Sequence, residues 1–239
     1  MKLFRYELRR LLCGKLFFTS LAVCLGFGWL TLTADIIRGT AHTAPFSPWS
    51  FGAYLTRLLP LLCMGELCMV SVFTSRRERA VSPLTRATPI DPRRYARLRQ
   101  GAVSVAALLL WLCVSGLAAA FFAILFDWRS FGTLIAPALL TMLPAALFCL
   151  GAGWRLGRCA PALVWAAMGA VLLLCWLPLP TWLAFSPLAF FTEYPLHLGE
   201  LDPAFSVSGE LLAGRALWCA SGAALLLWPS RPWKRRVGR

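Results

Sequence analysis

Cysteine and histidine are the residue types best able to hold a metal or form cross-links, but their spacing here favours neither. The sequence has nine cysteines, none in a C-x-x-C pair. Zinc sites and disulfide frameworks need clustered or regularly spaced thiols. His42 and His197 are isolated, so we expect no metal and no cofactor. Nearly all the thiols lie in apolar stretches, where they act as small apolar side chains: Cys13, Cys24, Cys63, Cys68, Cys113, Cys149, Cys159, Cys175 and Cys219.

Sequence motifs for catalysis are also missing. An ATP-binding loop reads G-x-x-x-x-G-K-[ST], but Gly14-Lys15 lacks both the first glycine and the following Ser or Thr. Neither a G-x-S-x-G nucleophile turn nor an H-E-x-x-H zinc motif occurs. An intramembrane hydrolase would need several polar groups at one depth. We therefore predict that this chain is not an enzyme.

Glu66 is the one acidic residue deep within an apolar stretch. It lies about 12 Å from the end of the predicted helix 53–74, at 1.5 Å per residue. Arg57 is nine residues earlier and falls on the opposite helix face, so the two cannot pair. We expect Arg57 and Arg215 to extend outward from the ends of their helices. Glu66 is either a neutral polar contact between helices or a group that lines a polar pathway.

Composition indicates the kind of protein that positions these residues. The chain has 239 residues, of which 59% are hydrophobic and only 14% charged, and its net charge is +14. Soluble domains carry about 25% charged residues. The mean hydropathy of +0.69 indicates a polytopic membrane protein. Its basic excess then marks one side of a membrane rather than a nucleic-acid surface.

Apolar stretches predict an all-α, polytopic integral membrane protein with six transmembrane helices, since about 20 apolar residues cross a bilayer. Pro178 and Pro180 divide the long uncharged stretch that follows Arg158 and leave 179–209 as an external segment. Residues 16–34 exceed the core of a signal peptide, so we expect an uncleaved span. Within the transmembrane domain 16–228, the predicted spans are 16–34, 53–74, 101–126, 131–153, 161–178 and 211–228.

Lys and Arg gather in alternate loops. Five lie in 1–15, eight in 75–100, two in 155–160 and five in the tail 229–239, whereas the opposite loops hold only Arg38 and Arg129. Cytoplasmic loops carry such an excess. We therefore expect both termini in the cytoplasm.

Residues 1–15 predict an amphipathic helix at the membrane surface. Phe4, Leu8, Leu11 and Leu12 share one helix face, and basic residues occupy most of the other. The simpler alternative is a basic flank that sets topology.

The loop 75–100 contains two helix-start signals. Ser82-Pro83 and Asp91-Pro92 each place a capping residue before a proline at the first helical position. The second helix would continue into the span 101–126. A plain basic loop, the alternative, would not require two such starts.

The external segment 179–209 is too apolar for a simple linker. It contains Trp182, Phe185, Phe190 and Phe191 together with prolines. Aromatic side chains favour the interface between membrane and water. We expect short helices there, at or dipping into the outer interface.

Together, these features resemble the permease subunit of type-2 ATP-binding-cassette exporters. The resemblance covers nearly the whole chain, and its sharpest local pieces are Arg77-Glu78-Arg79, Thr88-Pro89-Ile90, Arg94-Tyr95 and Ser186-Pro187. The chain departs from it by placing Arg97 and Arg99 where many relatives have a lysine.

This resemblance implies a separate ATPase subunit, a second permease subunit and contact with membrane lipid. It implies that Glu66 faces the substrate pathway. The substrate would be a hydrophobic or amphiphilic peptide, drug or lipid. The alternatives are a non-transporting scaffold or immunity-type protein, or an integral membrane enzyme. The ATPase would dock on a coupling loop through Glu78, Arg79, Pro83, Leu84, Arg86 and Pro89.

Overall fold

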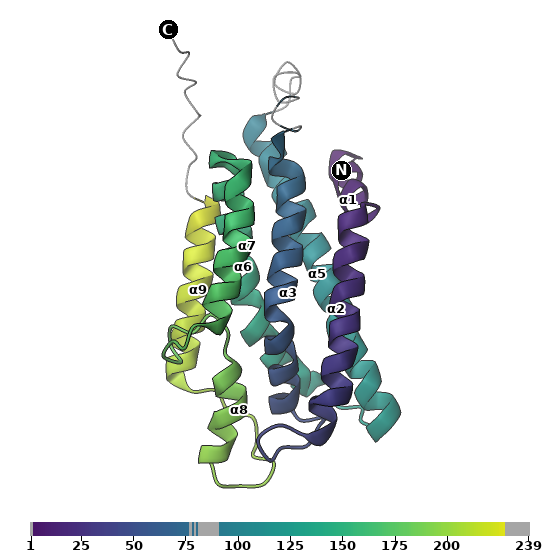
Figure 1. Cartoon of the computed structure of the whole chain (residues 1–239), viewed down its shortest axis with the longest axis vertical. Helices are drawn as coiled ribbons and strands as arrows, with labels where there is room; N and C mark the ends of the chain where they lie inside the picture. Colours follow the sequence, from purple (N-terminus) through teal and green to yellow (C-terminus); the bar gives the residue numbers. More distant parts are fainter. Residues whose placement is uncertain (1, 77, 79, 81–90, 228–239) are drawn as a thin grey trace.

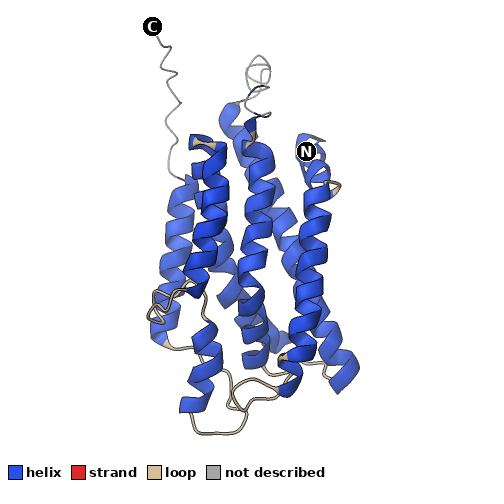
Figure 2. Ribbon diagram, viewed as in Figure 1, coloured by secondary structure: helices blue, strands red, loops and turns tan. Residues whose placement is uncertain are grey.

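The computed structural model describes residues 2–76, 78, 80 and 91–227, and this part of the chain contains helices and no strand (Figures 1 and 2). The helices form an elongated bundle. Their bounds are α1 Lys2–Leu12, α2 Lys15–Ala34, η1 Ile36–Arg38, α3 Pro48–Thr74, α5 Pro92–Phe126, η2 Phe131–Leu134, α6 Ile135–Cys159, α7 Pro161–Trp176, α8 Leu188–His197 and α9 Gly209–Leu227.

Five helical segments are long and apolar enough to cross a membrane, which is consistent with a multi-pass membrane protein. They correspond to five of the six predicted spans. The remaining predicted span, 161–178, contains the apolar helix α7, which has only 16 residues. The five longer segments are Lys15–Arg38, Pro48–Thr74, Arg94–Phe126, Phe131–Cys159 and Gly209–Leu227.

Two predicted helix starts can be compared with the structure. α5 begins at Pro92 and continues without a break to Phe126, as predicted. α3 begins at Pro48, five residues before the predicted membrane span 53–74. Its cap explains the earlier start: the Ser47 hydroxyl accepts a hydrogen bond from the Ser50 amide at 3.1 Å, and Pro48 fills the first helical position.

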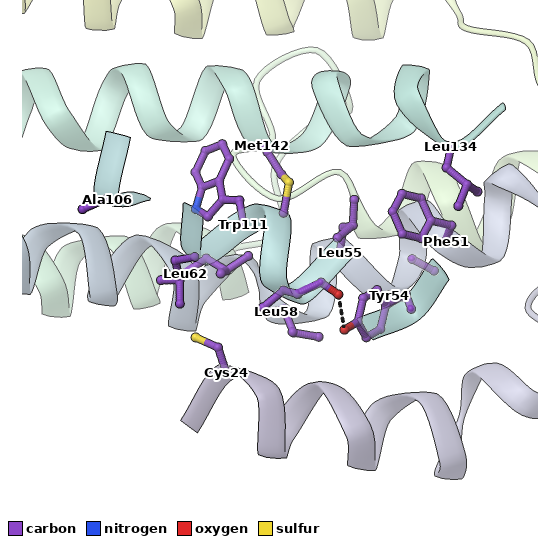
Figure 3. Packing of buried hydrophobic residues seen from close by; sticks show 14 of the residues in the cluster. Cys24, Phe51, Tyr54, Leu55, Leu58, Leu62, Ala106, Trp111, Leu134 and Met142 are labelled. Atoms are coloured by element: carbon purple, nitrogen blue, oxygen red, sulfur yellow. Dashed lines mark hydrogen bonds between the residues drawn. The ribbon is translucent and has the colours of Figure 1, made fainter. Parts of the chain in front are cut away.

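α3 is the central helix of the bundle. It packs against α2 and α5 on one side and against α6 and α7 on the other, and α8 contacts it as well. Towards α5, the Tyr54 hydroxyl donates to the carbonyl of Val114 at 3.1 Å (Figure 3). Aliphatic and aromatic side chains pack around it, and α3 is buried along most of its length.

The two ends of the bundle differ (Figure 1). We call the end that carries α1, residues 75, 76, 78 and 80 and the α6–α7 junction the basic end. The described chain both begins and finishes there, at α1 and at the last turn of α9. α8 lies at the opposite end, where the Phe191 ring occupies the space above Gly52 that a β-carbon would otherwise fill. The helix α8, together with turns and irregular chain, thus forms the segment 179–209.

Candidate functional site

Five polar side chains meet at the basic end, and we call them the ionic cluster: Glu7, Arg10, Glu78, Tyr95 and Arg99. Helical spacing makes this meeting possible, because residues three or four apart share a face. Glu7 and Arg10 therefore point together from α1, and Tyr95 and Arg99 point together from α5. Glu78 comes from the short segment that follows α3.

The ionic cluster is connected by hydrogen bonds. Glu7 Oε1 accepts from the Tyr95 hydroxyl at 2.6 Å and from Arg99 Nε at 3.2 Å. Arg99 Nη2 donates to Glu78 Oε2 at 2.7 Å, and Arg10 donates to the other oxygen of Glu78. Three segments far apart in sequence are thereby fastened to one another.

The ionic cluster is partly buried, and its charges balance. Glu7 is only 1% exposed, and two carboxylates balance two guanidinium groups. The Arg99 guanidinium also stacks over the Phe73 ring at 5.0 Å. Burial alone would raise the pKa of the Glu78 carboxyl, but hydrogen bonds and charge attraction from Arg10 and Arg99 lower it below its ordinary value.

The structure places one of the predicted coupling residues, Glu78, within this cluster. The others lie outside the described residues: Arg79, Pro83, Leu84, Arg86 and Pro89.

Sequence reasoning missed Glu7, Tyr95 and Arg99 as parts of a site. A signal for Glu7 was present, since it shares a helix face with Phe4, Leu8 and Leu11. An acid on the apolar face of a basic helix needs a buried partner.

Glu66 is also buried, at 1% exposure. It lies in α3. Its Oε2 atom has no hydrogen-bond partner within the described part of the chain. Glu66 is therefore buried inside the bundle of this one chain. Its role in a substrate pathway stays a prediction.

Arg215 does not extend outward, so that prediction was wrong. The residue is 3% exposed and donates to the carbonyls of Ala184 and Phe185. Trp218 Nε1 donates to the neighbouring carbonyl of Leu183 at 3.2 Å. These carbonyls belong to the non-helical chain between α7 and α8, whose backbone needs donors inside an apolar bundle.

Arg57 behaves differently from Arg215. It is partly exposed at the end opposite the ionic cluster and pairs with Asp35 at 2.5 Å. This arrangement agrees with the predicted outward direction of its side chain.

Metal-binding residue types are dispersed over the described chain. All nine cysteines are free thiols, and residues 2–76, 78, 80 and 91–227 contain no group of three or more His, Cys, Asp or Glu that could hold a metal ion.

Comparison with known proteins gives no relative: no family model, no curated protein and no solved structure matches the sequence.

Proposed function

We propose that this chain is the transmembrane permease subunit of an ATP-driven exporter in a prokaryotic cytoplasmic membrane. In this proposal α2, α3, α5, α6, α7 and α9 all cross the bilayer. The basic end then faces the cytoplasm, in keeping with its excess of Lys and Arg, and α1 lies along that membrane surface. A separate subunit hydrolyses ATP, and a second permease, identical or related, completes the pathway.

The observation that carries this proposal is the ionic cluster. Glu78 lies at the start of the loop between the proposed second and third spans, and it is bonded to both α1 and α5. A displacement of this loop would therefore pull on α5, which runs unbroken from the loop into the bundle. Coupling between two sites needs a shared element whose equilibrium both can bias. α5 supplies such an element.

Charge patterning makes the proposed orientation testable. Single cysteines introduced into a cysteine-free variant should be protected from an impermeant reagent near residues 85 and 235, and labelled near residues 43 and 200. The reason is the 20-to-2 division of Lys and Arg between the two sets of loops. Labelling of residue 85 in sealed cells, before any permeabilisation, would contradict the orientation.

ATP hydrolysis by the partner should be uncoupled from export when the coupling loop changes. Replacing Leu84-Thr85-Arg86 with Gly-Ser-Gly is expected to leave membrane insertion intact but to separate ATP hydrolysis from export. Affinity purification in mild detergent, followed by identification of bound chains, measures the association. The matched control replaces Glu200-Leu201, at the opposite end, with Gly-Ser. If no ATPase accompanies the native chain, the exporter proposal is wrong. If the loop variant still binds the ATPase and exports normally, only the coupling role of the loop is excluded.

Glu66 provides a test of the pathway. Glu66→Gln keeps size and hydrogen bonding but removes the ionisable group, so export should fall while insertion and assembly persist. Thr56→Val is the control, because it removes another buried polar group of α3, one that bonds within its own helix. Wild-type export by Glu66→Gln throughout the neutral pH range would exclude a pathway role for the charge.

A further inference from the structure

A cavity of about 160 Å³ lies where α1 turns into α2, against the last two turns of α3. Its size is well above the roughly 10–15 Å³ that one water molecule needs. Leu11, Leu16, Phe17, Met69 and Val72 form its apolar walls. Such a cavity suits a hydrocarbon group better than a polar solute.

Two basic side chains, Arg10 and Lys15, complete the lining, and no acidic residue of the described chain lines it. Lys15 is exposed and is the first residue of both α2 and the apolar segment that begins there. The Lys15 ammonium therefore lies at the level where a bilayer's apolar core gives way to its headgroups. A long basic side chain at that level attracts anionic headgroups.

We propose that this cavity binds one anionic glycerophospholipid. The phosphate lies against Lys15 and the outer edge of Arg10, and the start of one acyl chain enters between Phe17, Met69 and Val72. Charge complementarity selects an anionic lipid over a zwitterionic one, and the apolar walls select a lipid over a free anion. The proposal requires only that the chain spans a membrane and is independent of the exporter function.

Arg10 connects this lipid site to the ionic cluster. Its guanidinium lines the cavity and also bonds to Glu78, and it remains partly exposed. A phosphate beside Arg10 competes with Glu78 for the same hydrogen-bond donors. Lipid occupancy would thereby adjust how firmly the segment after α3 is held to α1.

The test measures lipid retention by the full chain, purified in detergent and stripped of lipid, using native mass spectrometry. Phosphatidylglycerol and phosphatidylcholine with identical acyl chains are titrated in parallel. One basic residue near a membrane surface contributes about 1 kcal/mol toward an anionic lipid, equal to about a fivefold change in affinity. Lys15→Gln should therefore weaken phosphatidylglycerol binding about fivefold and weaken phosphatidylcholine binding less, because the choline cation already offsets the phosphate of that lipid. Val72→Phe, which fills the cavity, should weaken both.

Lys2→Gln is the matched control, since it removes the same charge from the far end of α1 and should have no effect. Equal losses in Lys2→Gln and Lys15→Gln would show a general surface effect and overturn the site. Equal retention of the two lipids by the native chain would do the same. Displacement of phosphatidylglycerol by inorganic phosphate would reveal a free-anion site and overturn the assignment to a lipid.

Discussion

Replacing Gly222 with alanine will force α9 away from α6 and destabilise the bundle. A β-carbon at this position would collide with the Leu147 carbonyl carbon and lie 2.6 Å from both the Leu147 oxygen and the Phe148 nitrogen. Gly151 faces Gly222 from α6, and a β-carbon there would lie 2.6 Å from the Gly222 oxygen. The two helices therefore touch backbone to backbone, as small residues allow in membrane bundles.

Backbone atoms within two packed helices cannot rotate out of the way as a side chain can. Overpacking of a core costs typically 1–3 kcal/mol, so we expect a loss of about 3 kcal/mol for Gly222→Ala. Thermal unfolding in detergent measures the effect as a lower melting temperature. Gly116→Ala is the control, because a β-carbon there meets no described atom within 4 Å. That variant should gain up to about 1 kcal/mol from helix propensity. Equal melting temperatures for the two variants would contradict the close α6–α9 contact.

Replacing Arg99 with glutamine will release α1 from α5. Arg99 contacts both carboxylates of the ionic cluster, at 3.2 Å to Glu7 and 2.7 Å to Glu78. Without it, the buried Glu7 carboxylate keeps the Tyr95 hydroxyl and the more distant Arg10, at 3.7 Å, as its partners. Removing one partner of a buried ion pair costs about 3–5 kcal/mol, because the other charge remains buried. Partial exposure of the cluster should bring the loss to the lower end of that range.

Hydrogen exchange of the α1 amides measures this release, and faster exchange is expected in Arg99→Gln. Arg97→Gln is the matched control, since it removes an equal charge from the same helix at an exposed position. Exchange that is equally slow in both variants would show that apolar contacts alone hold α1 in place.

A lower pH should weaken the attachment of α1 to α5 in the native chain. The pKa of Glu78 is lowered in the folded state, so its pairs stabilise the structure above its ordinary value of 4.5. That stabilisation is lost as the pH falls from the ordinary value through the lowered one. Because intrinsic amide exchange itself slows in acid, the quantity to measure is the protection factor of the α1 amides, which should fall across this acidic range in the native chain and fall less in Glu78→Gln. Similar pH profiles for both would exclude Glu78 as the source.

Uncharged apolar stretches were enough to predict the long helices, because an apolar run of this length has few other stable environments. The apolar run did not indicate the start of α3, because Ser47-Pro48 precedes the most apolar part of the helix. Glu7 could have been suspected from its helix face, but its partners on α5 lie 88 and 92 residues away. The predicted outward direction of the Arg215 side chain was wrong for a related reason. Its acceptors are carbonyls of a non-helical segment, and no side-chain pattern in the sequence indicates free carbonyls.

The short length of α7 has a consequence for the membrane around this protein. Sixteen residues at 1.5 Å each give about 24 Å, whereas the hydrocarbon core of a bilayer is about 30 Å thick. In the proposed six-span arrangement, the irregular chain after Trp176, whose carbonyls bond to Arg215 and Trp218, would complete the crossing on that side. In that arrangement the hydrophobic belt of the protein would be uneven, and lipid tails beside α7 would shorten or tilt to match it. Such mismatch costs a fraction of a kcal/mol per Å, enough to concentrate a protein in thinner regions of membrane.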